Sequence, residues 1–197
     1  MYTSQLGQDI LIDKYLKQKI NGYFLDIGAS YAIQFSNSCF FERERKWKGV
    51  AVEHDIKYQD EWLIERPNSV FICGDATKCD YQRILDENNA PKIIDYLSID
   101  VDPPTTLSLE CLYEVFKTDY QFNTITFETD YGGDVECNFT RPSTRDDSRE
   151  FLKQRDYILI TEIYDRGKTH YHVDDFWVHK SIYDENFKIQ ERVVIYG

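Results

Sequence analysis

The chain has 197 residues, of which 42% are hydrophobic and 29% charged, and this suits a single domain over residues 1–197 with a substantial core. Its formal net charge of −12 disfavours a nucleic-acid partner, because phosphate binding needs a surplus of Lys and Arg. No segment is long and apolar enough to cross a bilayer, so we expect no membrane partner, and the polar residues 1–13 are not typical of a signal peptide. Five cysteines without CxxC spacing indicate a reducing compartment, and we expect a cytoplasmic protein (the host cytoplasm if the chain is viral).

Hydrophobic periodicity predicts alternating helices and strands. In chain order we predict a helix over 4–20, a strand over 23–27, a helix over 36–45, a strand over 50–53, a helix over 56–65, a strand over 70–73, a helix over 81–87, a strand over 93–99, a helix over 106–116, a strand over 122–128, a helix over 148–154, and strands over 157–163 and 188–196, with a short strand-like run at 176–178. The polar stretch 131–147 is expected to be a long loop. This pattern favours an α/β fold: a Rossmann-like, doubly wound, mostly parallel seven-stranded sheet flanked by helices.

Two short strings carry most of the functional information. Residues 24–30 form an apolar strand that runs through Gly28 into a small-residue turn, and residues 50–53 form a second apolar strand that ends in Glu53. A glycine turn after one strand and an acid after the next are typical of nucleotide sites, where the acid binds ribose hydroxyls. The turn is not GxGxxG, and Tyr31 stands where a pyrophosphate site would favour glycine. We therefore expect S-adenosylmethionine as the cofactor and methyl transfer as the reaction.

The order of several strings resembles FkbM-type S-adenosylmethionine-dependent O-methyltransferases. The matching strings are 4–9 (SQLGQD), 22–29 (GYFLDIGA), 36–38 (SNS), 41–42 (FE), 47–50 (WKGV), 52–53 (VE) and 95–101 (DYLSIDV). They cover roughly the first half of the chain. The resemblance implies the class I methyltransferase fold and modification of a glycan, and a Pro-Pro after the strand-four acids is similar to bacterial, viral and phage members.

The resemblance also implies roles for residues that bind the cofactor. Gly28 and Ala29 would face the methionine part, Asp26 would support the turn, and Glu53 would bind the ribose hydroxyls. The remaining expected contacts are Asp75 and Ala76 at the adenine edge, and Gln8 and Asn37, with Ser4 or Gln5 as additions, at the methionine end.

Acidic residues gather where the fourth and fifth predicted strands end. They are Asp100, Asp102, Glu128 and Asp130. Carboxylates at adjoining strand ends repel one another and favour a divalent cation such as Mg²⁺ or Mn²⁺. The arrangement resembles macrocin-type sugar O-methyltransferases, which implies Asp100, Glu128 and Asp130 as metal ligands and Asp102 as the base. The alternative is that these acids only cap backbone amides.

Other features leave alternatives open. We include His54 with Asp100 and Asp102 as a candidate catalytic residue, since it follows Glu53 directly, although it is equally typical of a solvated loop. The basic run at 43–48 is typical of a solvated helix end. The favoured function is O-methylation of a sugar or glycan hydroxyl; the alternatives are an NAD-dependent oxidoreductase on the same fold and a non-catalytic adenosyl-binding module. A homodimer stays open.

Overall fold

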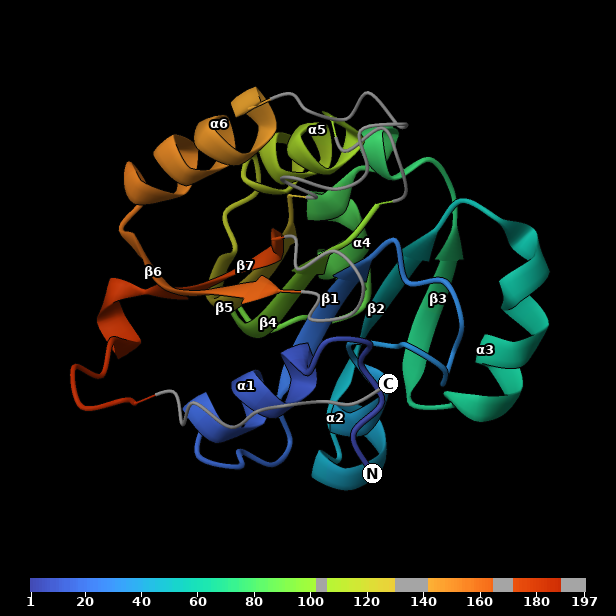
Figure 1. The fold of residues 1–197 in the computed structure, drawn as a ribbon. Coiled ribbons are helices and arrows are strands. Elements are labelled where there is room, and N and C mark those ends of the chain that lie inside the picture. Colours follow the sequence, from blue (N-terminus) through green and yellow to red (C-terminus); the bar gives the residue numbers. More distant parts are fainter. Residues whose placement is uncertain (102–105, 130–141, 165–171, 189–197) are drawn as a thin grey trace.

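The computed structural model describes residues 1–101, 106–129, 142–164 and 172–188, and in that part of the chain seven strands form one sheet (Figure 1). The strand order is β3-β2-β1-β4-β5-β7-β6. The strands are β1 (Tyr23–Ile27), β2 (Lys48–Glu53), β3 (Ser69–Cys73), β4 (Ile93–Ile99), β5 (Gln121–Glu128), β6 (Tyr157–Tyr164) and β7 (His172–His179). The first five pair in parallel, whereas β7 is antiparallel to both β5 and β6. The predicted doubly wound, mostly parallel sheet is confirmed.

Helices cover both faces of this sheet (Figure 1). They are α1 (Gln8–Tyr15), α2 (Cys39–Arg45), α3 (Gln59–Glu65), α4 (Tyr81–Glu87), α5 (Thr106–Val115) and α6 (Pro142–Lys153), with short 3₁₀ turns η1 (Ile56–Tyr58), η2 (Ala76–Lys78) and η4 (Lys180–Ile182). One apolar cluster joins α4, α5 and α6 to one face of the sheet, and two others join α1, α2 and α3 to the opposite face. No described helix has the length and apolar character needed to span a bilayer.

Strand β1 lies near the middle of the sheet and sends alternate side chains to the two faces. Leu25 and Ile27 pack in the cluster with α4 and α5, whereas Phe24 packs with α1 and α2. Asp26 shares the face of Phe24 and is only 2% exposed. The strand therefore carries a buried carboxylate to the carboxyl-terminal edge of the sheet, where ligands bind in open α/β folds.

The first helix is shorter than the predicted range of 4–20. It begins at Gln8, because the Asp9 carboxylate accepts hydrogen bonds from the backbone N–H groups of Thr3 and Ser4 and holds the preceding residues in a turn. It ends before Lys17 and Gln18, which both have positive φ angles.

The end of the chain differs most from the sequence prediction. The seventh strand is β7, where we expected mainly a loop, and the predicted strand over 188–196 lies almost wholly outside the described residues. Helix α6 begins at Pro142 rather than at 148, inside the expected loop, which proline allows because it is well tolerated in the first helical turn. The rest of that loop lies outside the described residues.

One buried ion pair fastens α2, α3 and the segment before α2 to each other. The Arg66 guanidinium lies 2.7 Å from Glu42 and donates to the carbonyl oxygen of Ala32 and to the hydroxyls of Ser36 and Ser38. Both charged side chains are almost fully buried. A buried charge that loses its partner is strongly destabilising, so each of these groups needs the other.

We expect Arg66→Met to lower the free energy of unfolding by about 3–5 kcal/mol, because it leaves the Glu42 carboxylate buried without its counter-ion. The control is Arg43→Met, which removes an ion pair with Glu65 in which both side chains are 40% exposed; its cost should stay below about 1 kcal/mol. Urea unfolding followed by circular dichroism measures both. Equal costs would contradict the assigned role of Arg66.

Candidate functional site

A cavity of about 770 Å³ opens at the carboxyl-terminal ends of β1, β2, β3 and β4. Residues from the turns after these four strands supply much of its wall. Its lining includes eight of the predicted site residues: Asp26, Gly28, Ala29, Asn37, Glu53, Asp75, Ala76 and Asp100. His54 lines it as well. The fold thus brings together the cofactor residues predicted from separate parts of the sequence, with the exception of Gln8.

The turn after β1 is held closely by both neighbouring strands. Gly28 has a φ angle of +80°, and its N–H donates to the Val52 carbonyl oxygen at 3.0 Å. A Cβ atom on Gly28 would lie 1.8 Å from the Asp100 carbonyl oxygen. We expected the glycine to allow a ligand to approach; the structure shows that it first allows the ends of β1 and β4 to approach each other.

Glu53 connects the turns that follow β1 and β2. One carboxylate oxygen accepts the N–H of Ser30 at 3.0 Å, and the other accepts the N–H of Asp55 at 2.7 Å. Each carboxylate oxygen can accept more than one hydrogen bond. Glu53 can therefore hold both turns and still accept hydroxyl groups from a ligand in the cavity.

Two buried oxygens in the cavity wall lack a hydrogen-bond donor among the described residues. They are Oδ2 of Asp26 and Oδ1 of Asn37, whose amide nitrogen donates to Ser98 at 3.0 Å. Burial raises the pKa of Asp26, and the Ser38 hydroxyl and the charge of Arg66 oppose that rise. Buried oxygens of this kind usually have a partner. A cationic donor such as the ammonium of an amino-acid group is the kind of partner that such oxygens take, so this wall is compatible with the methionine end of S-adenosylmethionine.

The turn after β3 carries Asp75 at the solvent-exposed side of the cavity. Its carboxylate accepts from the backbone and hydroxyl of Thr77 and pairs with Lys78 at 2.5 Å. Its hydrogen bonds with Lys78 and Thr77 lower the pKa of Asp75 to about 2. The Asp75 side chain therefore stays ionised and acts as a hydrogen-bond acceptor over the whole neutral range.

The aromatic side chains of Tyr31 and Tyr58 form another part of the wall. Their rings meet edge to face with centroids 4.9 Å apart, and Lys57 lies over the Tyr58 ring. The sequence prediction treated Tyr31 only as a departure from a glycine motif and did not include Tyr58. The position of Tyr58, five residues after the acid that ends β2, is the signal that could have indicated it.

Gln8 is not part of the cavity wall. Its amide donates to Asp174 of β7 at 2.6 Å, and its side-chain oxygen accepts the N–H of Leu6. Gln8 therefore has a structural contact with β7, and its cofactor contact stays a prediction, whereas Gln5 lines the cavity.

The predicted metal ligands are only partly described. Asp100 and Glu128 follow or end the neighbouring strands β4 and β5, whereas Asp102 and Asp130 lie outside the described residues. A divalent metal at this edge stays a prediction. The described residues do hold one cluster of three potential ligands, formed by Glu162, His172 and Asp175.

That cluster is already neutralised by arginine. Arg149 donates to both oxygens of Asp175 at 2.7 Å and to Glu162 at 2.6 Å. Arg145 also donates to Glu162, and His172 lies 2.9 Å from Asp175. A cation would have to displace a guanidinium group, so this arrangement is an ion-pair network between α6, β6 and β7 rather than a metal centre.

Comparison with solved structures places the fold among methyltransferases. TrmK of M. capricolum in complex with S-adenosylhomocysteine has a TM-score of 0.55 and 15% identity, covering 90% of this chain and 71% of that one. The METTL16 methyltransferase domain gives 0.60 and 11%, covering 91% and 68%. A proposed rRNA methylase of Clostridium thermocellum gives 0.57 and 12%, covering 90% and 97%. This is the class I methyltransferase fold. No protein-family model and no curated protein matches the sequence.

We expect Gly28→Ala to destabilise the protein and to abolish ligand binding in the cavity, because the new methyl group would collide with the Asp100 backbone at a strained φ angle. Gly74→Ala, at the end of β3, is the matched control, since its Cβ would meet only the Cys79 sulfur at 3.8 Å. Thermal unfolding and titration with S-adenosylhomocysteine measure both effects. A Gly28→Ala protein as stable as Gly74→Ala would contradict the close contact between β1 and β4.

Proposed function

We propose that this chain is an S-adenosylmethionine-dependent O-methyltransferase that acts on a hydroxyl group of a sugar or glycan. The assignment of the cofactor rests on the cavity wall formed by Glu53, Asp26 and Asn37. The Glu53 carboxylate can accept hydroxyl groups, and Asp26 and Asn37 each have a buried oxygen that lacks a donor among the described residues. The class I methyltransferase fold supports the same cofactor. S-adenosylmethionine supplies an electrophilic methyl group on a sulfonium sulfur.

Different residues of the cavity would bind different parts of the cofactor. Asp26 and Asn37 would accept hydrogen bonds from the ammonium group, and Glu53 would accept them from the ribose hydroxyls. Asp75 and the backbone of Ala76 would contact the adenine edge, beside the turn after β3. His54, which lies next to Glu53 in the cavity wall, then fits an adenosyl contact better than a catalytic role.

Methyl transfer to a sugar hydroxyl forms a carbon–oxygen bond, breaks a carbon–sulfur bond and releases the hydroxyl proton. A base must take that proton, because an alcohol is a weak nucleophile. Asp100 lines the cavity at the end of β4 and is the described carboxylate proposed for this role. Asp102 shares the role in the proposal, and a divalent cation held with Glu128 and Asp130 would lower the pKa of the hydroxyl.

The charge of the chain supports a neutral acceptor. With 35 acidic and 23 basic residues, the protein repels polyphosphates such as nucleic acids. The polar cavity residues Gln5 and Gln34 offer amide groups suited to hydroxyls. A nicotinamide-dependent oxidoreductase is not favoured, because the turn at Gly28 lacks a second glycine and the similar structures reported above are methyltransferases.

We expect Glu53→Gln to weaken binding of S-adenosylhomocysteine by about ten- to a hundredfold, because the amide cannot accept hydrogen bonds on both arms. Glu65→Gln, on the exposed surface of α3, is the control and should bind normally. Isothermal titration calorimetry measures the affinity. If Glu53→Gln bound as tightly as the unchanged protein, the assignment of the ribose site would be wrong.

We expect Asp100→Asn to lose methyl transfer by about a hundredfold or more while it still binds S-adenosylhomocysteine, because removal of a general base typically costs 10²–10⁴ in rate. The assay follows a methyl group labelled with tritium into a panel of deoxysugar-containing glycans, with and without Mn²⁺. Glu110→Gln, in the same cavity wall but on α5, is the control. Full activity in Asp100→Asn would exclude it as the base, and no transfer by the unchanged protein to any glycan would contradict the sugar acceptor.

A further inference from the structure

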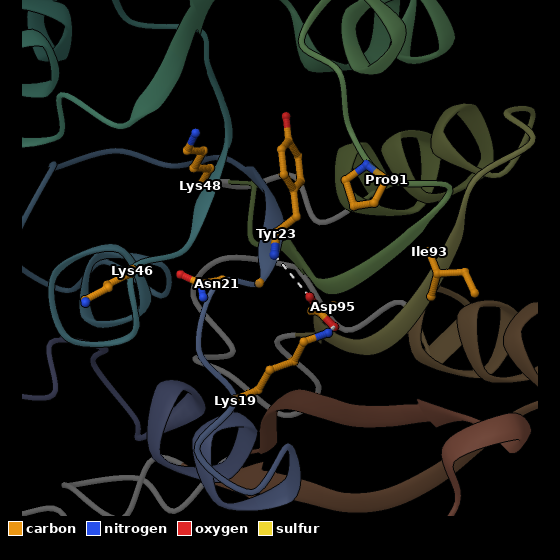
Figure 2. A pocket seen from close by; sticks show the side chains of 9 residues that line it. Lys19, Asn21, Tyr23, Lys46, Lys48, Pro91, Ile93 and Asp95 are labelled. Atoms are coloured by element: carbon orange, nitrogen blue, oxygen red, sulfur yellow. Dashed lines mark hydrogen bonds and ion pairs between the residues drawn. The ribbon is translucent and has the colours of Figure 1, made fainter.

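A second cavity lies at the opposite, amino-terminal edge of the sheet (Figure 2). Its volume is about 460 Å³, and it is formed where β1, β2 and β4 begin. The lining residues are Lys19, Asn21, Gly22, Tyr23, Lys46, Lys48, Pro91, Ile93 and Asp95. None of them belongs to the cavity proposed for the cofactor.

The lining carries three lysines and a single acid in a protein whose net charge is −12. The acid is already satisfied: Asp95 pairs with Lys19 at 2.6 Å and also accepts the Tyr23 N–H and the Asn123 amide. Lys46 and Lys48 are both exposed, and neither has a carboxylate within 4.0 Å among the described residues. Their two ammonium groups are therefore available to a ligand.

Lys46 and Lys48 belong to the basic run at 43–48, together with Arg43 and Arg45. The two arginines already have carboxylate partners, since Arg43 pairs with Glu65 and Arg45 pairs with Asp13. The sequence suggests that this run is a uniform solvated helix end. In the structure, Arg43 and Arg45 form ion pairs, whereas Lys46 and Lys48 line a cavity.

The opposite wall of this cavity is apolar. In Figure 2, Pro91 and Ile93 lie across from Lys46 and Lys48, with Tyr23 and Asp95 between them. Ile93 opens β4 and is 54% exposed, so its apolar side chain is accessible from this cavity. A Cβ atom on Gly22 would lie 2.4 Å from the Trp47 ring, so the backbone of Gly22 packs directly against that ring.

We infer that this cavity binds a phosphate ester with a compact, partly apolar body, such as a sugar phosphate. In Figure 2 the side chains of Lys46 and Lys48 extend away from Pro91 and Ile93, so both long, exposed side chains turn inward when they bind the phosphate oxygens as point charges, a common use of lysine. The body packs against Ile93, Pro91 and the ring of Tyr23, and Asn21 offers a hydrogen bond to it. The ligand is distinct from the methyl acceptor, because the two cavities open at opposite edges of the sheet: Tyr23 lines this one and Asp26 lines the other, about 10 Å apart along β1 at 3.3 Å per residue.

The test is calorimetric titration of the intact chain with glucose 1-phosphate, pyrophosphate and glucose, in a phosphate-free buffer of constant ionic strength. We expect both phosphates to bind and glucose not to bind. Lys46→Gln/Lys48→Gln should weaken both phosphates by about tenfold or more, since a hydrogen bond to a charged group contributes on this scale. Ile93→Ala should weaken glucose 1-phosphate but leave pyrophosphate unchanged.

The control is Lys14→Gln/Lys153→Gln, which removes the same charge from two exposed lysines outside this cavity and should bind as the unchanged protein does. All variants should retain binding of S-adenosylhomocysteine, so the outcome is independent of the proposed methyltransferase activity. The inference is overturned if glucose binds as well as its phosphate. It is equally overturned if no phosphate binds, or if both double variants lose affinity equally.

Discussion

The buried guanidinium of Arg66 is the group on which the cofactor side of this structure depends. It ends α3, pairs with Glu42 of α2 and bonds to Ala32, Ser36 and Ser38 on the segment between β1 and α2. That segment carries Asn37. The positive charge of Arg66 also opposes the rise that burial causes in the pKa of Asp26. A single ion pair thus sets both the packing of two helices and the electrostatics of one cavity wall. Few substitutions could change one without the other.

The second constraint is backbone contact around Gly28. The turn after β1 bonds to the Val52 carbonyl of β2 and lies directly against the Asp100 carbonyl of β4, while Glu53 joins it to the next turn. All of these contacts join groups of the protein to each other. The cavity is therefore organised in advance, and a ligand does not have to order the loops it contacts. The same contact brings the proposed base, Asp100, next to the proposed methionine site.

The sequence predicted the part of the fold that rests on local pattern. Buried parallel strands are continuous apolar runs, and so β1, β4 and their acidic or glycine ends could be placed within a residue or two. Only residues 176–178 of strand β7 were predicted as strand-like, because the strand also buries Asp174 and Asp175. Their partners, Gln8 and Arg149, lie 166 and 26 residues away, and no local rule reveals them.

Charge is distributed unevenly between the two edges of the sheet, and this bears on what each cavity can accept. The proposed cofactor cavity holds Asp26, Glu53, Asp75 and Asp100, and its two lysines, Lys57 and Lys78, are paired with Asp55 and Asp75. An anion at this edge would meet a surplus of carboxylates at short range. A methyl acceptor with a phosphate near the reacting hydroxyl is therefore disfavoured, whereas a neutral hydroxyl is not. At the other edge Lys46 and Lys48 reverse the balance, and this difference in charge would direct the proposed neutral sugar and the proposed phosphorylated ligand to different cavities.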